Sequence, residues 1–297
     1  MLTKFLDPKN DVAFRRIFGT EKNKDILIAF LNDMIVFKGG EPVTEVTFLK
    51  TVQDPEIATQ KKPASLMFCA QIKRAILIVE MQVAKERGFE KRAQYYAAKA
   101  YSAQLPIKGK YNNLKEVIFL AIANFVMFPN KESYKSDHII LDKDNYEHDM
   151  KDFSFTFLEL PKINQSLEES NTMVEKWAYF FKNAETTPEE TLDSIVSRDI
   201  PLRRAYEELN RFSWNEEELR TYEQTEKYEG CYIASMDQKY DEGVEKGEKM
   251  GMEKGETKAK LDIARKMFES GMEKKSVSLM TGLSLEQLDL LIDETGL

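Results

Sequence analysis

The chain has few of the residues that build disulfide frameworks and zinc clusters. Its 297 residues include two cysteines, Cys69 and Cys231, and two histidines, His138 and His148. Two cysteines exclude a disulfide framework, and this small set argues against a zinc cluster. The longest apolar run, residues 117–128, is too short for a membrane helix, and the amino terminus lacks a signal-peptide pattern. These absences predict a cytoplasmic protein that does not cross a membrane.

Acidic residues are missing from a long stretch in the first half of the chain. No Asp or Glu occurs between Glu56 and Glu80. The apolar run over residues 75–83 is broken only by Glu80 and Gln82, and strand periodicity places these two side chains on one face at one edge of a sheet. A buried carboxylate needs a partner, so Glu80 is either half of a core ion pair or a ligand at an active site. Spacing alone leaves both interpretations open.

Four segments in a fixed order carry a resemblance to a known family. They are residues 7–19 (DPKNDVAFRRIFG), residues 79–82 (VEMQ), the predicted helix with Phe89, Arg92, Tyr95 and Tyr96, and the Gly109-x-Tyr111 turn before an apolar strand. Together they resemble the Rpn family of recombination-promoting nucleases, also described as transposases, within the PD-(D/E)XK nuclease superfamily. The resemblance implies an α/β (α+β) fold with a PD-(D/E)XK-type mixed sheet flanked by helices, followed by an all-helical C-terminal region.

The resemblance also implies a chemistry. In that superfamily an Asp on one strand and a Glu-x-Lys on the next hold a divalent ion against the scissile phosphate, and Mg²⁺ suits such hard oxygen ligands. By this resemblance Glu80 is a metal ligand. Gln82 takes the lysine position, where it could orient the attacking water but adds no positive charge. The alternative for Gln82 is a strand-edge amide that hydrogen-bonds to a loop.

The family's first Asp is missing from this chain. The strand that should carry it has no acid, and the loss falls at Leu66 or Met67. Permissible codons for residues 65–77, shifted by one nucleotide, give Val-Asp-Val-Leu-Cys-Thr-Asp-Lys-Lys-Gly-Asn-Thr-Tyr, which is similar to the missing segment. We interpret this as a pair of compensating frameshifts, entered near Pro63 and left near Ile78. Ordinary divergence of the strand is the alternative.

Loss of the Asp predicts an incomplete Mg²⁺ site, because neither replacement offers an oxygen ligand. Asp11 or Asp54 is a candidate for the missing ligand beside Glu80. The function expected by resemblance is a Mg²⁺-dependent DNA endonuclease that promotes recombination, impaired in this copy. The alternatives are a catalytically inactive DNA-binding or protein-interaction subunit and a non-functional relic of a mobile element.

Charge is divided unevenly along the chain. Residues 1–128 contain 20 Lys and Arg against 13 Asp and Glu, whereas residues 129–297 contain 23 against 38. The first part can therefore face phosphate, while the acidic second part would not bind nucleic acid nonspecifically. The candidate DNA contacts are Arg15, Arg16, Arg92, Tyr95 and Lys99. The alternative for such basic residues is a solvated helix face.

Periodicity divides the chain into three parts. Residues 1–165 form an αβ core, which by the resemblance is PD-(D/E)XK nuclease-like. A helical extension over 166–238 follows, and then a glycine-repeat helix or linker with a small helix-turn-helix-like module over 239–297. In the core, helices are predicted at 11–32 and 86–104, and strands at 43–49, within 65–83 (two), at 117–128, 138–141 and 153–160. In the extension, helices are predicted at 168–183, 188–197, 202–212 and 216–238, with Trp177 and Trp214 as packing anchors.

The tail has two notable patterns. Glycine recurs at positions 243, 247, 251 and 255, and each internal glycine costs a helix about 1 kcal/mol relative to alanine. Close approach of helices in a homo-oligomer would explain this stripe, and a flexible charged linker is the alternative. Beyond it, residues 274–292 form a helix-turn-helix pattern with a capping box at Ser284. Its second helix is acidic, which favours packing or partner docking over DNA reading.

Overall fold

The computed structural model describes residues 3–49, 65–105, 109–166, 169–188, 190, 192 and 199–295. The chain divides into two compact units, Met1–Tyr232 and Ile233–Leu297. In the part of the chain that is described, no helix combines the length and the apolar character that a membrane span requires.

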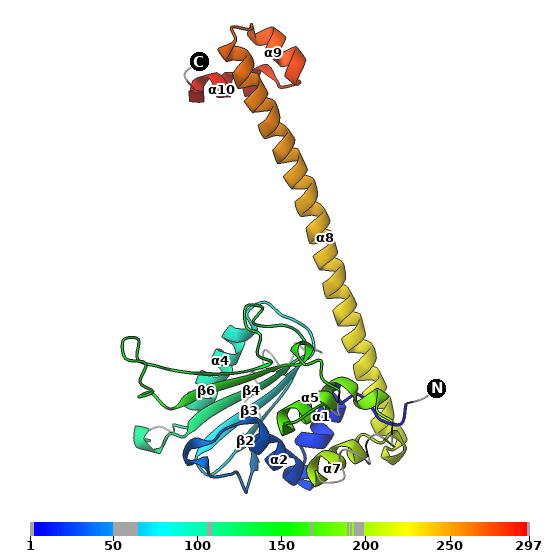
Figure 1. The fold of residues 1–297 in the computed structure, drawn as a ribbon. Helices are drawn as coiled ribbons and strands as arrows, with labels where there is room; N and C mark the ends of the chain where they lie inside the picture. The colour runs from blue at the N-terminus through cyan, green and yellow to red at the C-terminus, as the bar shows by residue number, and fades with distance from the viewer. Residues whose placement is uncertain are drawn as a thin grey trace. The chain divides into compact units, whose positions relative to one another are not determined.

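A six-stranded mixed sheet forms the centre of the first unit (Figure 1). Its strands are β1 (Thr47–Leu49), β2 (Ser65–Gln71), β3 (Ala75–Gln82), β4 (Glu116–Ala123), β5 (Lys135–Ile139) and β6 (Phe153–Glu159). They lie in the order β1-β2-β3-β4-β6-β5. The pairs β3–β4 and β4–β6 are parallel, and the other three pairs are antiparallel. The predicted mixed sheet is confirmed. The predicted position of Glu80 at an edge is wrong, because β3 is paired on both sides.

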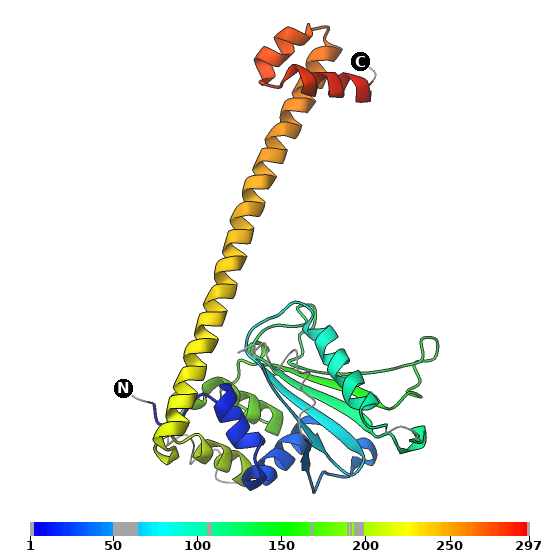
Figure 2. The ribbon, with the colours of Figure 1, turned by 180° about the vertical axis from the view of Figure 1, so that it is seen from behind.

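Helices cover both faces of the sheet. They are α1 (Asp11–Phe18), α2 (Lys24–Met34), α4 (Phe89–Ser102), α5 (Met173–Asn183), α7 (Ile200–Glu208) and α8 (Glu216–Glu269), which begins in this unit. Helix α4 lies on one face, whereas α1, α2, α5 and α7 lie on the other (Figure 2). Phe89, Ala93 and Ala97 follow one another at intervals of four residues, so α4 presents a single apolar stripe to the sheet.

The face opposite α4 has an aromatic core. The rings of Phe18 and Phe30 lie 4.9 Å apart, and Trp177 contacts both of them. Trp177 is fully buried and donates its indole N–H to Asp33 at 2.8 Å, so its polar atom is satisfied. Each fully buried aromatic side chain stabilises the fold by about 1.5–3 kcal/mol. Trp177 and Trp214 are both buried, as the predicted role of packing anchor requires.

Several boundaries differ from the prediction. The single helix expected over residues 11–32 is two helices, because α1 ends at Gly19, whose N–H bonds to Arg15. The strand expected at 43–49 is confined to β1. Most of the helix expected at 188–197 lies outside the described residues. The two strands expected within 65–83 are present, and the turn between them closes without glycine through a 2.9 Å hydrogen bond from Ile72 N–H to Ala75.

The second unit is helical. Helix α8 continues through all four glycines of the stripe, so this segment is helical. Helices α9 (Lys274–Thr281) and α10 (Leu285–Thr295) follow. Their small core consists of Ala264, Val277, Leu283, Leu288 and Leu291. The capping box is present, because Ser284 N–H donates to Gln287 at 2.9 Å and Gln287 N–H donates to the Ser284 hydroxyl at 3.2 Å.

Candidate functional site

Glu80 and Gln82 lie at the carboxyl end of β3, on the face covered by α4. Both side chains are fully buried. Strand alternation puts them on the same side as Ile76 and Ile78, which pack in the core beneath α4. Gly88 has a φ of 78°, in the left-handed region that glycine adopts without strain, and α4 starts directly after it. This turn brings the second turn of α4 over the end of β3.

Arg92 is the central cation of the site. One guanidinium nitrogen, Nη2, donates to both Glu80 Oε1 and Gln82 Oε1, and the other, Nη1, donates to Glu86 Oε2 at 2.8 Å. The guanidinium also lies 4.9 Å from the centre of the Phe89 ring. The core ion pair weighed from the sequence for Glu80 is therefore present, and its partner is a residue that sequence reasoning had placed at the site as a DNA contact.

Sequence reasoning missed Glu86 and Tyr232. The Tyr232 hydroxyl donates to Glu86 Oε1 at 3.0 Å, so Glu86 accepts hydrogen bonds from both Tyr232 and Arg92. Tyr232 is 146 residues away in sequence, on the part of α8 that belongs to the first unit. Tyr96 lies close by, and burial raises the pKa of its hydroxyl, with Arg92 opposing the shift. Only the short spacing between Glu86 and Arg92 could have been noticed in the sequence.

Gln82 has contacts that fit the alternative interpretation of a loop-bonded amide. Its Nε2 donates to the Ala84 carbonyl at 2.7 Å, and its Oε1 accepts from Arg92. The next strands place Glu159 on the same face and at the same end of the sheet, two strands away. Glu159 accepts from the backbone N–H groups of Met127 and Phe128 and pairs with Lys162 at 2.8 Å. It therefore stabilises the loop after β4.

Asp11, the second candidate metal ligand, lies beside Glu229 of α8. The backbone N–H of Asp11 donates to Glu229, and burial raises the pKa of Asp11 to about 6 and that of Glu229 to about 8. Glu229 Oε1 is buried and has no hydrogen-bond partner in the described part of the chain. Asp54, the other acid named for this role, lies outside the described residues.

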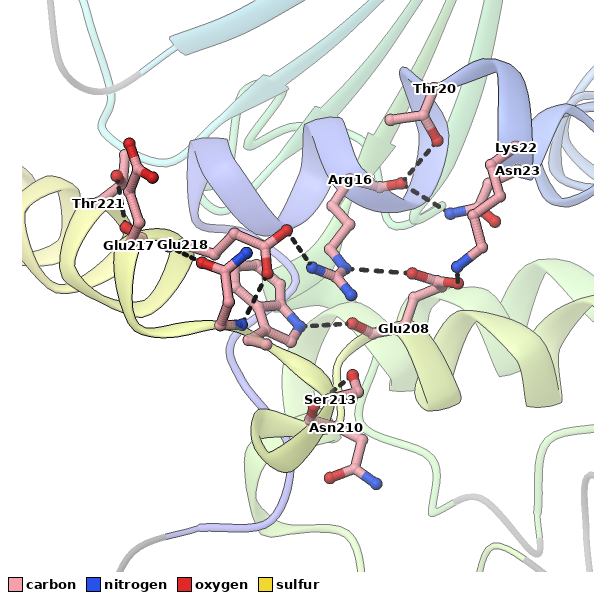
Figure 3. Close-up of polar contacts among 12 residues, drawn as sticks. Arg16, Thr20, Lys22, Asn23, Glu208, Asn210, Ser213, Glu217, Glu218 and Thr221 are labelled. Carbon is pink, nitrogen blue, oxygen red and sulfur yellow. Dashed lines mark hydrogen bonds and ion pairs between the residues drawn. The ribbon is translucent and has the colours of Figure 1, made fainter.

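The basic candidates have different surroundings. Arg16 is tied to the helices that follow the sheet, through Glu208 at 3.1 Å and Glu218 at 2.7 Å (Figure 3). Its guanidinium also lies 4.5 Å from the Trp214 ring, so it binds two parts of the chain together. The other candidates lie nearer to solvent: Arg15 is exposed, Tyr95 is half exposed, and the Lys99 ammonium lies 5.9 Å from the Tyr95 ring.

Family models match most of the chain. One described as PD-(D/E)XK nuclease family transposase matches residues 8–239. The chain belongs to this family. A model described as the C-terminal HTH domain of the Rpn/YhgA-like nuclease family matches residues 257–293, which confirms the resemblance to Rpn transposases and suggests DNA binding. No curated protein and no solved structure matches the chain.

PD-(D/E)XK nucleases generally use divalent metals, but the described residues around Glu80 do not fit one while the Arg92 guanidinium lies among them. Met67 lies opposite Glu80 in the register of β2 and β3 and offers a thioether in place of an oxygen. Gln82 is neutral, and the Arg92 guanidinium lies against both Glu80 and Gln82. Among the described residues, no three His, Cys, Asp or Glu side chains are grouped so that they could hold a metal.

Proposed function

We propose that this PD-(D/E)XK family transposase binds DNA near the end of β3 and is impaired in the Mg²⁺-dependent cleavage expected of a complete site. One observation carries the proposal. The position across from Glu80 is Met67, so the neighbouring strand offers no hard oxygen ligand beside Glu80, and the nearby carboxylates Glu80 and Glu86 both accept from Arg92. The family membership supports a role in transposition or recombination of DNA, and we place the protein in the cytoplasm for that reason.

Plasmid nicking tests the catalytic part of the proposal. We expect purified protein to leave supercoiled DNA intact in the presence of Mg²⁺, because Glu80 alone cannot assemble the site. Glu80→Ala is the matched variant and should behave like the wild type. Robust nicking that disappears in Glu80→Ala would contradict the proposal. It would mean that another acid, Asp11 or Asp54, supplies the missing ligand.

Under this proposal the protein binds DNA without cleaving it. A measurement of DNA binding therefore also distinguishes the proposed function from a non-functional relic. Arg15, Tyr95 and Lys99 are the candidates whose side chains lie toward solvent. We expect Arg15→Ala and Lys99→Ala each to weaken duplex binding, measured by fluorescence anisotropy, and to reduce the salt slope by about 1. Lys143→Ala, an exposed lysine in the acidic part of the chain, is the control. A relic would give no binding in any variant.

The second unit supports a different role. Helix α10 has Glu286 and Asp289 and no Lys or Arg, whereas a helix that reads the major groove is usually basic or amide-rich. We infer that α9 and α10 dock a partner or pack within an oligomer, and that copies of the chain associate along α8. An electrophoretic mobility shift with residues 233–297 deleted tests the first point, since full DNA affinity should remain.

A further inference from the structure

The site contains a permanent positive charge. Arginine stays protonated at all physiological pH values, so the guanidinium of Arg92 cannot lose its charge. Its Nη2 donates to Glu80 and Gln82 together, and its side chain is only 20% exposed. Glu80 is fully buried, and a buried carboxylate needs a compensating charge. Arg92 supplies that charge from within the chain.

A second pair of contacts fixes Arg92 in this position. Glu86 accepts from Arg92 Nη1 on one oxygen and from the Tyr232 hydroxyl on the other, at 2.8 and 3.0 Å. The Glu86 side chain is 12% exposed, so water competes little for these bonds. The Phe89 ring lies against the guanidinium. Three elements, β3, α4 and the start of α8, therefore contribute to the position of one cation.

We propose that the Arg92 guanidinium takes the place of the divalent ion in this chain, so that an ion can reach Glu80 only by displacing Arg92. The inference rests on the proposed assignment of Glu80 to the functional site. It explains how the fold retains a buried glutamate after the loss of the neighbouring acid. Tyr232 and Glu86 are positioning residues in this arrangement, since they act on the site through Arg92.

Thermal unfolding of the full chain, with and without millimolar Mg²⁺ or Mn²⁺, tests the proposal without DNA. The unfolding midpoint of the wild type should not respond to either ion. Arg92→Ala removes the guanidinium that pairs with the buried Glu80 carboxylate, so its midpoint should fall by roughly 6–12 °C. Mn²⁺, Mg²⁺ or a low concentration of methylguanidinium should then restore part of the loss. Arg87→Ala, which removes an exposed arginine nearby, should change neither the midpoint nor the ion response.

A wild-type midpoint that rises with Mg²⁺, and no longer does so in Glu80→Gln, would overturn the proposal, because the ion would then bind beside Arg92. An Arg92→Ala protein that gains nothing from cations would overturn it as well. If Arg92→Ala does not fold, the double variant Arg92→Ala with Glu80→Gln should fold again and ignore cations; failure to recover would count against the charge argument. The readout is stability, so an absence of nicking or DNA binding would leave this result untouched.

Tyr232→Phe separates positioning from bulk stability. The variant keeps the ring and loses only the hydroxyl that holds Glu86. We expect a midpoint close to that of the wild type and a measurable response to Mn²⁺, because Arg92 is less firmly held. Tyr228→Phe on the same helix, with a half-exposed ring, is the control and should show no ion response. If neither variant responds to Mn²⁺, the Tyr232 hydroxyl does not help to position Arg92.

Discussion

Met67 lies opposite Glu80 in the antiparallel pairing of β2 and β3. Directly opposed residues in such a pair have Cβ atoms about 4.5–5.5 Å apart and point to the same face. Of the two positions considered for the lost Asp, only Met67 therefore places a carboxylate beside Glu80. We predict that Met67→Asp gains Mg²⁺-dependent plasmid nicking roughly a hundredfold above the background seen with the wild type, the size of one electrostatic contact to a transition state.

Leu66→Asp is the matched control for this experiment. Leu66 pairs with Met81, whose side chain belongs to the core on the opposite face of the sheet. An acid there should add no nicking, because the register places position 66 on the face of the sheet opposite to Glu80. If Leu66→Asp gains activity and Met67→Asp does not, the register assignment of the lost acid is wrong.

Arg16 should be more important for stability than for DNA binding. It pairs with Glu208 and Glu218 and contacts the Trp214 ring, so it links α1 to α7 and α8 (Figure 3). We predict that Arg16→Ala lowers the free energy of unfolding by about 1–3 kcal/mol, measured in urea, since the partners are partly buried. The neighbouring Arg15→Ala removes an exposed side chain and should cost less than about 0.5 kcal/mol. Equal losses would contradict this assignment.

The Asp11–Glu229 pair predicts a specific pH dependence. Burial, together with the nearby carboxylates of Asp11, Asp7 and Glu226, raises the pKa of Glu229 from 4.5 to about 8. A raised pKa means that the folded state favours the protonated acid. The stabilising contribution is therefore complete below about pH 4.5 and is lost as the pH rises toward about 8. The pKa of Asp11 is raised to about 6, so Asp11 also stabilises the folded state at low pH, and this contribution is lost as the pH rises toward about 6.

Glu229→Gln isolates this effect. Glutamine keeps an oxygen for the Asp11 backbone N–H and cannot ionise. We predict a higher unfolding midpoint than the wild type at pH 8, with the difference shrinking toward pH 5. Glu223→Gln, an exposed position on the same helix, should give parallel curves. A variant curve parallel to that of the wild type would show that Glu229 is ionised in the folded state at every pH tested.

The strands of the first unit could be predicted from the sequence because their side chains carry the signal. Residues 75–83 are almost continuously apolar, as expected for a strand buried on both faces. Its position inside the sheet could not be predicted, since strand order depends on pairing across the chain. The break between α1 and α2 was missed because the apolar spacing continues across Gly19 and only the helix cap reveals the end.

The candidate site could be predicted only in part, for a similar reason. Glu80 and Gln82 were evident as polar residues in an apolar strand. Their partner Arg92 follows on the next helix, but the choice between DNA phosphate and Glu80 as its ligand depends on the turn at Gly88. Tyr232 carries no local signal, because its contact with Glu86 depends on how α8 packs against the rest of the first unit.

The glycine stripe of α8 leads to the last prediction. Gly243, Gly247 and Gly251 recur on one side of the helix, and among the described residues no atom outside the local helix backbone and the flanking residues lies within 4 Å of where their Cβ atoms would be. Tyr240 and Val244 are exposed near the same stripe. Glycines are costly inside a helix, so four of them indicate that another surface approaches closely. A second copy of α8 is the partner we propose.

Light scattering should therefore show an oligomer that becomes monomeric when residues 240–297 are deleted, while the sheet of the first unit stays folded because all its strands lie upstream. Gly247→Leu should weaken assembly even though replacing glycine favours the helix locally by about 1 kcal/mol. Glu245→Leu places the same leucine side chain on the other side of the helix and should leave assembly unchanged. The two effects of Gly247→Leu oppose each other, so unchanged or stronger assembly in that variant would exclude close glycine packing and leave α8 as an isolated helix.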